Sequence, residues 1–106
     1  MKLLFICNQN KNRSTTAEEM MKTKFETKSA GLFNEKPVQE RTIAWADVVI
    51  VMEDAQRKEL AKRFPKQYLQ KKILTLNIPD VYSYNQQALK EIISRKMKEL
   101  VNQAML

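Results

Sequence analysis

The chain has 106 residues, of which 43% are hydrophobic, and it carries a formal net charge of +7. This length suits one domain and is too short for two, so we expect a single domain over residues 1–106. No apolar run approaches the roughly 20 residues that span a bilayer, which excludes a membrane protein. A single cysteine argues against a disulfide framework and favours a reducing, cytoplasmic location.

The excess positive charge would attract phosphorylated or otherwise anionic partners. A solvated basic surface without such a partner would give the same charge. The lysines are spread along the chain without the interleaved aromatic residues of a base-stacking platform. The distribution of lysines and aromatic residues therefore does not support binding to nucleic acid.

Strand and helix patterns alternate along the chain. Strands are predicted at 3–7, 24–29, 47–52 and 72–76, and helices at 14–23, from Pro37 onward, at 54–64 and at 85–105. The last helix has the clearest apolar stripe, formed by Leu89, Ile92, Ile93, Met97, Leu100, Val101 and Ala104. This alternation predicts an α/β fold with a four-stranded parallel sheet and helices on both faces. The only glycine, Gly31, is expected to permit a tight turn after the second strand.

Cys7 ends the first predicted strand, and the segment Asn-Gln-Asn-Lys-Asn-Arg13-Ser14 follows it. Ligands of open parallel sheets bind at the carboxyl ends of strands, which is where Cys7 lies. The chain has no histidine to act as a base. A loop of backbone N–H groups that runs into a helix N-terminus, with an arginine beside it, can instead favour the thiolate. The same loop would bind a phosphate dianion.

This segment resembles the phosphate loop of the low-molecular-weight protein tyrosine phosphatase family, which reads Cys-x-Gly-Asn-x-Cys-Arg-Ser directly after the first strand. Gln9 and Asn12 replace the family's glycine and second cysteine. The segments 29–32 and 46–52 also look similar to the family. The resemblance implies the family's flavodoxin-like, phosphotyrosine phosphatase I-like fold. The loop positions that match are Cys7, Asn10, Arg13 and Ser14.

Each loop residue has an expected role on this interpretation. Cys7 would attack phosphorus and become a phosphocysteine, while Arg13 would bind two phosphoryl oxygens bidentately. The Ser14 hydroxyl would donate to the Cys7 sulfur. The N–H groups of the remaining loop positions would surround the phosphoryl group, which makes these residues candidates for substrate binding: Asn8, Gln9, Asn10, Lys11 and Asn12. Tyr82 is a further candidate, because an aromatic side chain would form a wall of a pocket for an aryl phosphate.

Departure of the leaving group requires a general acid, for which the chain offers three aspartates. Asp47 begins a strand, at the wrong end of the sheet. Asp54 lies in the first turn of a helix, where it would interact with the helix dipole. Asp80 follows the fourth strand and is the favoured candidate, with Asp54 and Glu53 next. The family carries its acid on the corresponding loop as Asp-Pro, whereas the order here is Pro79-Asp80, and Asp80 could instead form a turn.

These features predict a phosphomonoesterase, specifically a tyrosine phosphatase, that acts on a phosphotyrosine protein or a small aryl phosphate. We expect it to bind phosphate-like oxyanions and to need neither metal nor cofactor. Two other classes stay open. One is a phosphocysteine phosphoryl carrier of the sugar phosphotransferase type, which needs neither Arg13 nor Asp80 for hydrolysis. The other is a module that holds phosphate or nucleic acid without turnover.

Overall fold

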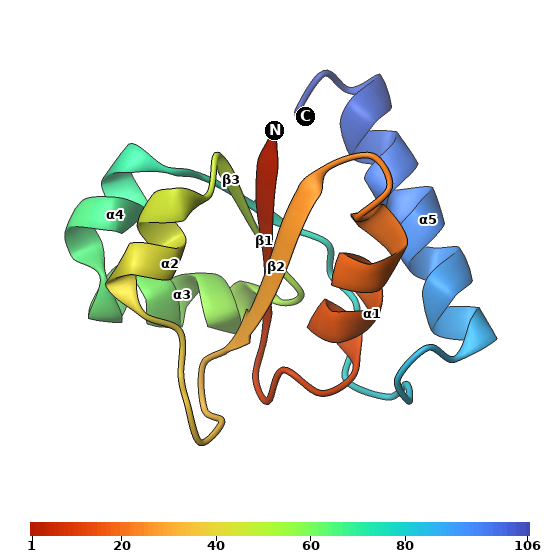
Figure 1. Cartoon of the computed structure of the whole chain (residues 1–106), viewed down its shortest axis with the longest axis horizontal. Helices are drawn as coiled ribbons and strands as arrows, with labels where there is room; N and C mark the ends of the chain where they lie inside the picture. Colours follow the sequence, from red (N-terminus) through yellow and green to blue (C-terminus); the bar gives the residue numbers. More distant parts are fainter.

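Four parallel strands form one sheet in the order β2-β1-β3-β4 in the computed structural model, which describes residues 1–106 (Figure 1). The strands are β1 (Lys2–Cys7), β2 (Glu26–Gly31), β3 (Val48–Val51) and β4 (Lys72–Thr75). Cys7 is paired with Gly31 of β2, and Ile6 with Val51 of β3. The chain leaves β1 toward one edge for β2 and returns to its other side for β3. The carboxyl ends of β1 and β3 therefore border the point where the strand order reverses, which is where ligands of such sheets bind.

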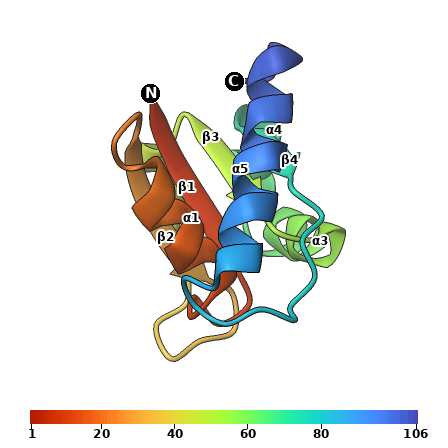
Figure 2. The same cartoon turned by 90° about the vertical axis from the view of Figure 1, so that its right-hand side faces the viewer.

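Five helices cover the two faces of the sheet; cover on both faces was predicted, but by four helices. They are α1 (Arg13–Met21), α2 (Glu40–Trp45), α3 (Asp54–Arg63), α4 (Pro65–Gln70) and α5 (Gln87–Asn102). Helices α1 and α5 lie on one face, and α2, α3 and α4 lie on the other (Figures 1 and 2). The four-stranded α/β architecture expected from the sequence is thus confirmed.

The strand period of two divides the core between these faces. Phe5 and Cys7 of β1 point into the cluster under α1 and α5, whereas Leu4 and Ile6 point into the cluster under α2, α3 and α4. Strand β3 alternates in the same way, and all four of its residues are buried. Full burial of each such side chain contributes about 1.5–3 kcal/mol, so the two central strands anchor the sheet. Cys7, the last residue of β1, is therefore held by the best-packed part of the sheet.

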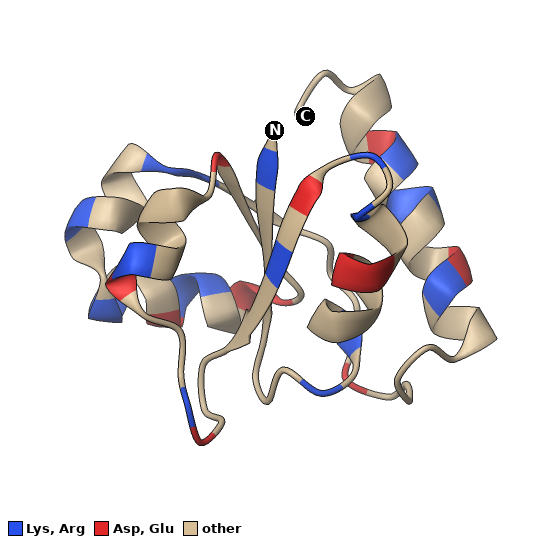
Figure 3. Ribbon diagram, in the orientation of Figure 1, with Lys and Arg blue, Asp and Glu red and all other residues tan.

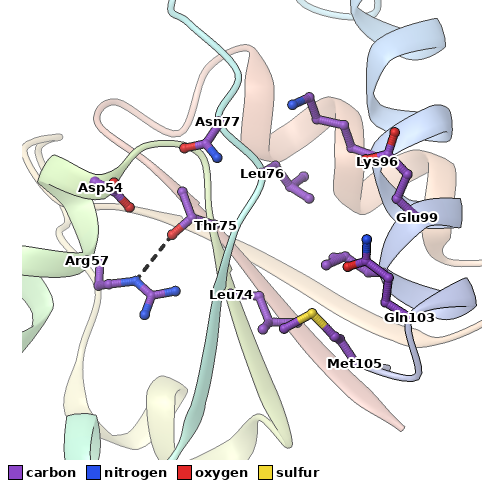
Figure 4. Close-up of a pocket in the computed structure, with 11 residues that line it drawn as sticks. Asp54, Arg57, Leu74, Thr75, Leu76, Asn77, Lys96, Glu99, Gln103 and Met105 are labelled. Atoms are coloured by element: carbon purple, nitrogen blue, oxygen red, sulfur yellow. Dashed lines mark hydrogen bonds between the residues drawn. The ribbon is translucent and has the colours of Figure 1, made fainter.

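Arg57 of α3 protects the outer edge of β4. Its Nη2 donates to the Ile73 carbonyl at 2.8 Å. Its Nε donates to Thr75 Oγ1 at 3.2 Å (Figure 4). A helix side chain that covers an edge strand and occupies one of its carbonyls discourages pairing with another chain. A pocket of about 320 Å³ lies in front of this edge, lined by residues from α3, β4, α5 and the segments that follow the last two (Figure 4). Neither Cys7 nor Arg13 lines it.

Several helix boundaries differ from the sequence prediction, those of α2 and α5 among them, and one helix, α4, was not predicted. Helix α2 begins at Glu40 rather than near Pro37, because the Val38 N–H donates to the Gly31 carbonyl at 2.8 Å and holds this segment against the end of β2. Pro65 ends α3 as expected but also begins α4, which was not predicted; proline suits the first turn of a helix. Helix α5 ends at Asn102, and Val101 and Ala104 are exposed. The apolar stripe therefore stops at Leu100.

No helix combines the length and the apolar composition needed to cross a membrane.

Candidate active site

The chain turns from β1 into α1 through residues 7–14, which we call the cysteine loop. Asn10 has a φ of 54°, in the left-handed region that asparagine tolerates better than most residues. Gln9, which replaces the glycine of the family pattern, is exposed and has no positive φ. The missing glycine therefore does not strain the loop. Asn12 is the N-cap residue of α1, so the helix begins at Arg13, one residue earlier than predicted.

The Cys7 sulfur is held by a short chain of hydrogen bonds. It lies 2.9 Å from Ser14 Oγ, and Ser14 Oγ donates to Asn10 Oδ1 at 2.9 Å. A hydroxyl has one proton, so Ser14 can donate either to Asn10 or to a Cys7 thiolate, but not to both. In the thiol form, the S–H group donates to Ser14. The contact between Cys7 and Ser14 expected from the sequence is present, and Cys7 is only 3% exposed.

The backbone of the loop offers a row of unused donors. None of the N–H groups of residues 8–13 donates a hydrogen bond within the protein. The loop is fastened instead through the Asn8 carbonyl, which accepts from the N–H groups of Leu32 at 3.0 Å and Phe33 at 2.8 Å. Backbone donors at a helix N-terminus, together with the helix dipole, form a favourable environment for an oxyanion.

Arg13 is 1% exposed and is anchored through one of its terminal nitrogens. Nη1 donates to the Glu53 carboxylate and, at 2.7 Å, to the Ile78 carbonyl. The edge of the guanidinium formed by Nε and Nη2 makes no hydrogen bond within the protein. Since a guanidinium presents its N–H groups as a planar fork, this edge can bind two oxygens at once, as the bidentate prediction for Arg13 requires.

Asp80 follows β4, as predicted, and the structure places it beside Arg13. Its Oδ1 is 3.8 Å from Arg13 Nε, and its side chain is 57% exposed in the connection from β4 to α5. Asp54 lies in the first turn of α3, and Asp47 accepts from the Lys2 N–H at the opposite end of the sheet. Tyr82, a predicted pocket wall, is partly buried and packs against the core cluster under α1 and α5. Its contact with substrate stays a prediction.

Two residues that hold the site together were given no such role by sequence reasoning. Glu53 was considered only as a reserve acid, yet it anchors Arg13. Gln56 is 1% exposed; its Oε1 accepts from the N–H groups of Met52 and Glu53, and its Nε2 donates to Asn8 Oδ1 at 3.2 Å. The Glu53-x-x-Gln56 spacing before a helix is a recognisable capping pattern. This pattern predicts the hydrogen bond from the Glu53 N–H to Gln56, but it does not predict the hydrogen bond from Gln56 to Asn8.

Gly31 matters for close packing and not for a turn, so the expectation from sequence was wrong. It is the last residue of β2 and has no positive φ. A Cβ at this position would lie 2.6 Å from Asn34 Oδ1 and 3.0 Å from the Asn8 carbonyl oxygen. The absence of a side chain at Gly31 thus lets the segment after β2 pack against the cysteine loop.

The sheet order β2-β1-β3-β4 and the layers of helices define a four-stranded parallel α/β fold, and comparisons with solved structures agree on this fold. A low-molecular-weight protein tyrosine phosphatase from T. tengcongensis is 22% identical, with a TM-score of 0.77 over 97% of this chain and 99% of that chain. The YwlE arginine phosphatase from Geobacillus stearothermophilus is 20% identical, with a TM-score of 0.75 over 98% and 95%. The tyrosine phosphatase Wzb from Escherichia coli K30, in complex with phosphate, is 17% identical, with a TM-score of 0.76 over 96% of each chain.

These likenesses show that the chain has the fold of the low-molecular-weight protein tyrosine phosphatases, as the resemblance of the cysteine loop implied. No protein-family model matches the sequence, and no match is found among curated proteins.

Proposed function

We propose that this protein is a cysteine-dependent phosphomonoesterase that hydrolyses aryl phosphates, such as phosphotyrosine in a protein, through a phosphocysteine on Cys7. The observation that carries the proposal is the convergence of three groups on one loop. The Cys7 sulfur touches Ser14, unused backbone donors of residues 8–13 follow it, and the free edge of Arg13 stands at the start of α1. Phosphate bound to Wzb, which shares the fold, supports an oxyanion site.

In the first half of the reaction, the Cys7 thiolate attacks phosphorus and the bond from phosphorus to the ester oxygen breaks. The backbone donors and the Nε–Nη2 edge of Arg13 stabilise the charge that develops on the phosphoryl oxygens. Asp80, in its acid form, donates its proton to the departing oxygen, so the phenol leaves neutral. The products of this half are the free phenol and a phosphocysteine.

In the second half, the Asp80 carboxylate accepts a proton from a water molecule while the water oxygen attacks the phosphocysteine. The bond from sulfur to phosphorus breaks, and inorganic phosphate and the Cys7 thiolate are released. Ser14 assists this step because its hydroxyl proton can turn from Asn10 to the departing sulfur. Asp80 ends in its acid form, ready for the next cycle.

The two alternatives from the sequence are less well supported. A phosphoryl carrier has no use for an acid beside the loop, whereas Asp80 Oδ1 lies 3.8 Å from Arg13 Nε. A module that only holds phosphate would not need a sulfur with a hydroxyl donor in contact. The combination of nucleophile, cation and acid favours hydrolysis over both.

Phosphoarginine is a second candidate substrate, because one of the similar structures is an arginine phosphatase. Its phosphorus is bonded to nitrogen, and its leaving group carries a guanidinium. The carboxylates of Glu53 and Asp80, close to Arg13, would be suitable partners for such a cation. The same assay with both substrates decides which is preferred.

The test is hydrolysis of p-nitrophenyl phosphate, phosphotyrosine and phosphoarginine by the purified protein, with vanadate as an inhibitor and Cys7→Ser as the matched variant. We expect vanadate-sensitive turnover that Cys7→Ser abolishes, since an unactivated hydroxyl is a far weaker nucleophile than a thiolate. A labelled phosphocysteine that persists until a second molecule accepts the phosphoryl group would indicate the carrier. Phosphate binding without any turnover would indicate the binding module.

We also propose the reducing cytoplasm as the location of this protein. Cys7 is the only cysteine and is free. A catalytic thiolate works only while it remains reduced, and thiols persist in the cytoplasm.

A further inference from the structure

A hollow of about 250 Å³ adjoins the cysteine loop on the side of β2. One wall is Asn10 of the loop, and the others come from the end of β2, the β2–α2 connection and the start of α2. The two cations that line it are Lys36 and Arg41. We call this hollow, defined by Asn10, Lys36 and Arg41, the basic hollow.

The cations of the basic hollow have no anionic partner in the protein. Neither Lys36 nor Arg41 forms an ion pair, and both are exposed. The acidic side chain that precedes Arg41 in the chain, Glu40, accepts a hydrogen bond from Gln67. Glu35, at the exposed tip of the connection, is the other acidic neighbour in sequence. Lys11 of the cysteine loop is also exposed and makes no ion pair.

The basic hollow is held in place relative to the cysteine loop. The start of the connection is bonded to the loop, because the N–H groups of Leu32 and Phe33 donate to the Asn8 carbonyl. Its end is bonded to β2, because the Val38 N–H donates to the Gly31 carbonyl at 2.8 Å. A ligand group in the basic hollow would therefore keep a defined position relative to a phosphoryl group on the loop.

Charge is distributed unequally around the loop. Glu53 and Asp80 contact Arg13 on the side of β3 and β4, while Lys36 and Arg41 lie on the side of β2. Basic and acidic segments both occur along this end of the sheet (Figure 3). An anionic group of a bound substrate would be repelled on the side of Asp80 and attracted on the side of the basic hollow.

We propose that the substrate carries a second acidic group, a carboxylate or a second phosphate, and that this group binds between Lys36 and Arg41 while the phosphoryl group occupies the cysteine loop. This inference rests on the proposed function, since it names the substrates that the phosphatase prefers. For a protein substrate, the group is an acidic side chain or a second phosphorylated residue near the phosphotyrosine.

The experiment compares kcat/KM for three phosphotyrosine peptides that differ only near the phosphotyrosine: a neutral one with alanines, one with aspartates and one with a second phosphate. We expect the two acidic peptides to be preferred by about 3- to 20-fold over the neutral one at low salt, the range given by two exposed ion pairs. The preference should decline as salt screens the charges. Comparison of the aspartate and bisphosphorylated peptides identifies which anion is favoured.

Two double variants locate the effect. Lys36→Ala with Arg41→Ala should reduce the ratio of kcat/KM for acidic over neutral peptides to about one. Lys58→Ala with Lys62→Ala removes the same charge from two exposed residues of α3 that form no ion pair, and it should leave the ratio unchanged. If both pairs of substitutions lower the ratio equally, the effect is general attraction and the basic hollow is not a site.

Failure of this inference differs from failure of the proposed function. Turnover of p-nitrophenyl phosphate with equal kcat/KM for all three peptides would overturn the second acidic group and leave the phosphatase intact. If no substrate is turned over, the phosphatase proposal fails. In that case, fluorescence anisotropy measures the Kd of the same peptides for the wild-type protein. Equal Kd values for neutral and acidic peptides would overturn the basic hollow as a binding site as well.

Discussion

Glu53, the N-cap residue of α3, holds Arg13 in place. The Arg13 Nη1 donates to this carboxylate and to the Ile78 carbonyl, which leaves the Nε–Nη2 edge without a hydrogen bond, with Asp80 Oδ1 3.8 Å from Nε. Arg13 is buried, whereas the Glu53 side chain is 41% exposed. The ion pair therefore orients the guanidinium that the proposed reaction needs. Because the Glu53 side chain is partly exposed, a substitution there breaks the pair without changing a fully buried residue.

We predict that Glu53→Ala lowers kcat/KM for an aryl phosphate by about 10²-fold, because a catalytic group that shifts by about 1 Å loses that much. Loss of the partner of a buried charge should also reduce the free energy of unfolding by about 1–3 kcal/mol, measured by urea denaturation. Asp54→Ala, at the neighbouring exposed carboxylate, is the control: it should leave kcat/KM unchanged and cost at most the ~0.3–1 kcal/mol of its interaction with the dipole of α3. Wild-type kinetics in Glu53→Ala would show that Ile78 alone suffices to orient Arg13.

Arg13→Lys keeps the positive charge but removes the planar fork. A lysine amino group cannot bond Glu53, the Ile78 carbonyl and two phosphoryl oxygens from one position. We expect transition-state stabilisation to fall by about 2–4 kcal/mol, measured as the ratio of kcat/KM values. Near-normal kinetics would mean that Arg13 only supports the fold.

The role of Gly31 can be tested with a matched pair of substitutions. Gly31→Ala should reduce the free energy of unfolding by about 1–3 kcal/mol, because the new Cβ overlaps Asn34 Oδ1. Asn34→Ala removes that oxygen, so adding Gly31→Ala to it should cost much less than in the wild type. Thermal unfolding of the four proteins measures this coupling. Fully additive effects would place the strain at the Asn8 carbonyl instead.

The contacts that sequence could anticipate are the local ones. Cys7 and Ser14 are only seven residues apart, at the two ends of the turn from β1 into α1, and they lie 2.9 Å apart. The anchors of Arg13 are 40 and 65 residues away, at Glu53 and at the Ile78 carbonyl. These contacts form only because the segments that follow β3 and β4 lie next to the end of β1 in the folded sheet. The Ile78 acceptor is a backbone carbonyl, which every residue has, so the residue type does not predict it.

The fold was easier to anticipate than its details. The buried apolar run of β3 and the alternating elements were sufficient to predict a parallel sheet covered on both faces. Helix α4 was missed because Pro65 was taken only as the end of α3, although proline also suits a first helical turn. Gly31 was misjudged because its purpose depends on Asn34, which contacts it only in the folded chain.

The role of Asp80 is the sharpest remaining test, because its assignment rests on elimination and on its place beside Arg13. A general acid matters most when the leaving group is basic. Asp80→Asn should therefore slow hydrolysis of phosphotyrosine by about 10²–10⁴-fold. p-Nitrophenyl phosphate should be slowed much less, because its acidic phenol departs without full protonation. Asp54→Asn, in the first turn of α3, is the matched control and should slow neither substrate.

Phosphotyrosine and p-nitrophenyl phosphate together also distinguish proton donation by Asp80 from a structural role. If Asp80→Asn slows both equally, Asp80 shapes the loop or the direction of Arg13 and does not donate a proton. If it slows neither, Asp80 has no part in the reaction. A selective loss with phosphotyrosine in Asp54→Asn would move the acid to α3. Because the Asp80 side chain is exposed and lies 3.8 Å from Arg13 Nε, its replacement by the isosteric amide should leave the fold unchanged, so selective slowing would identify the proton donor.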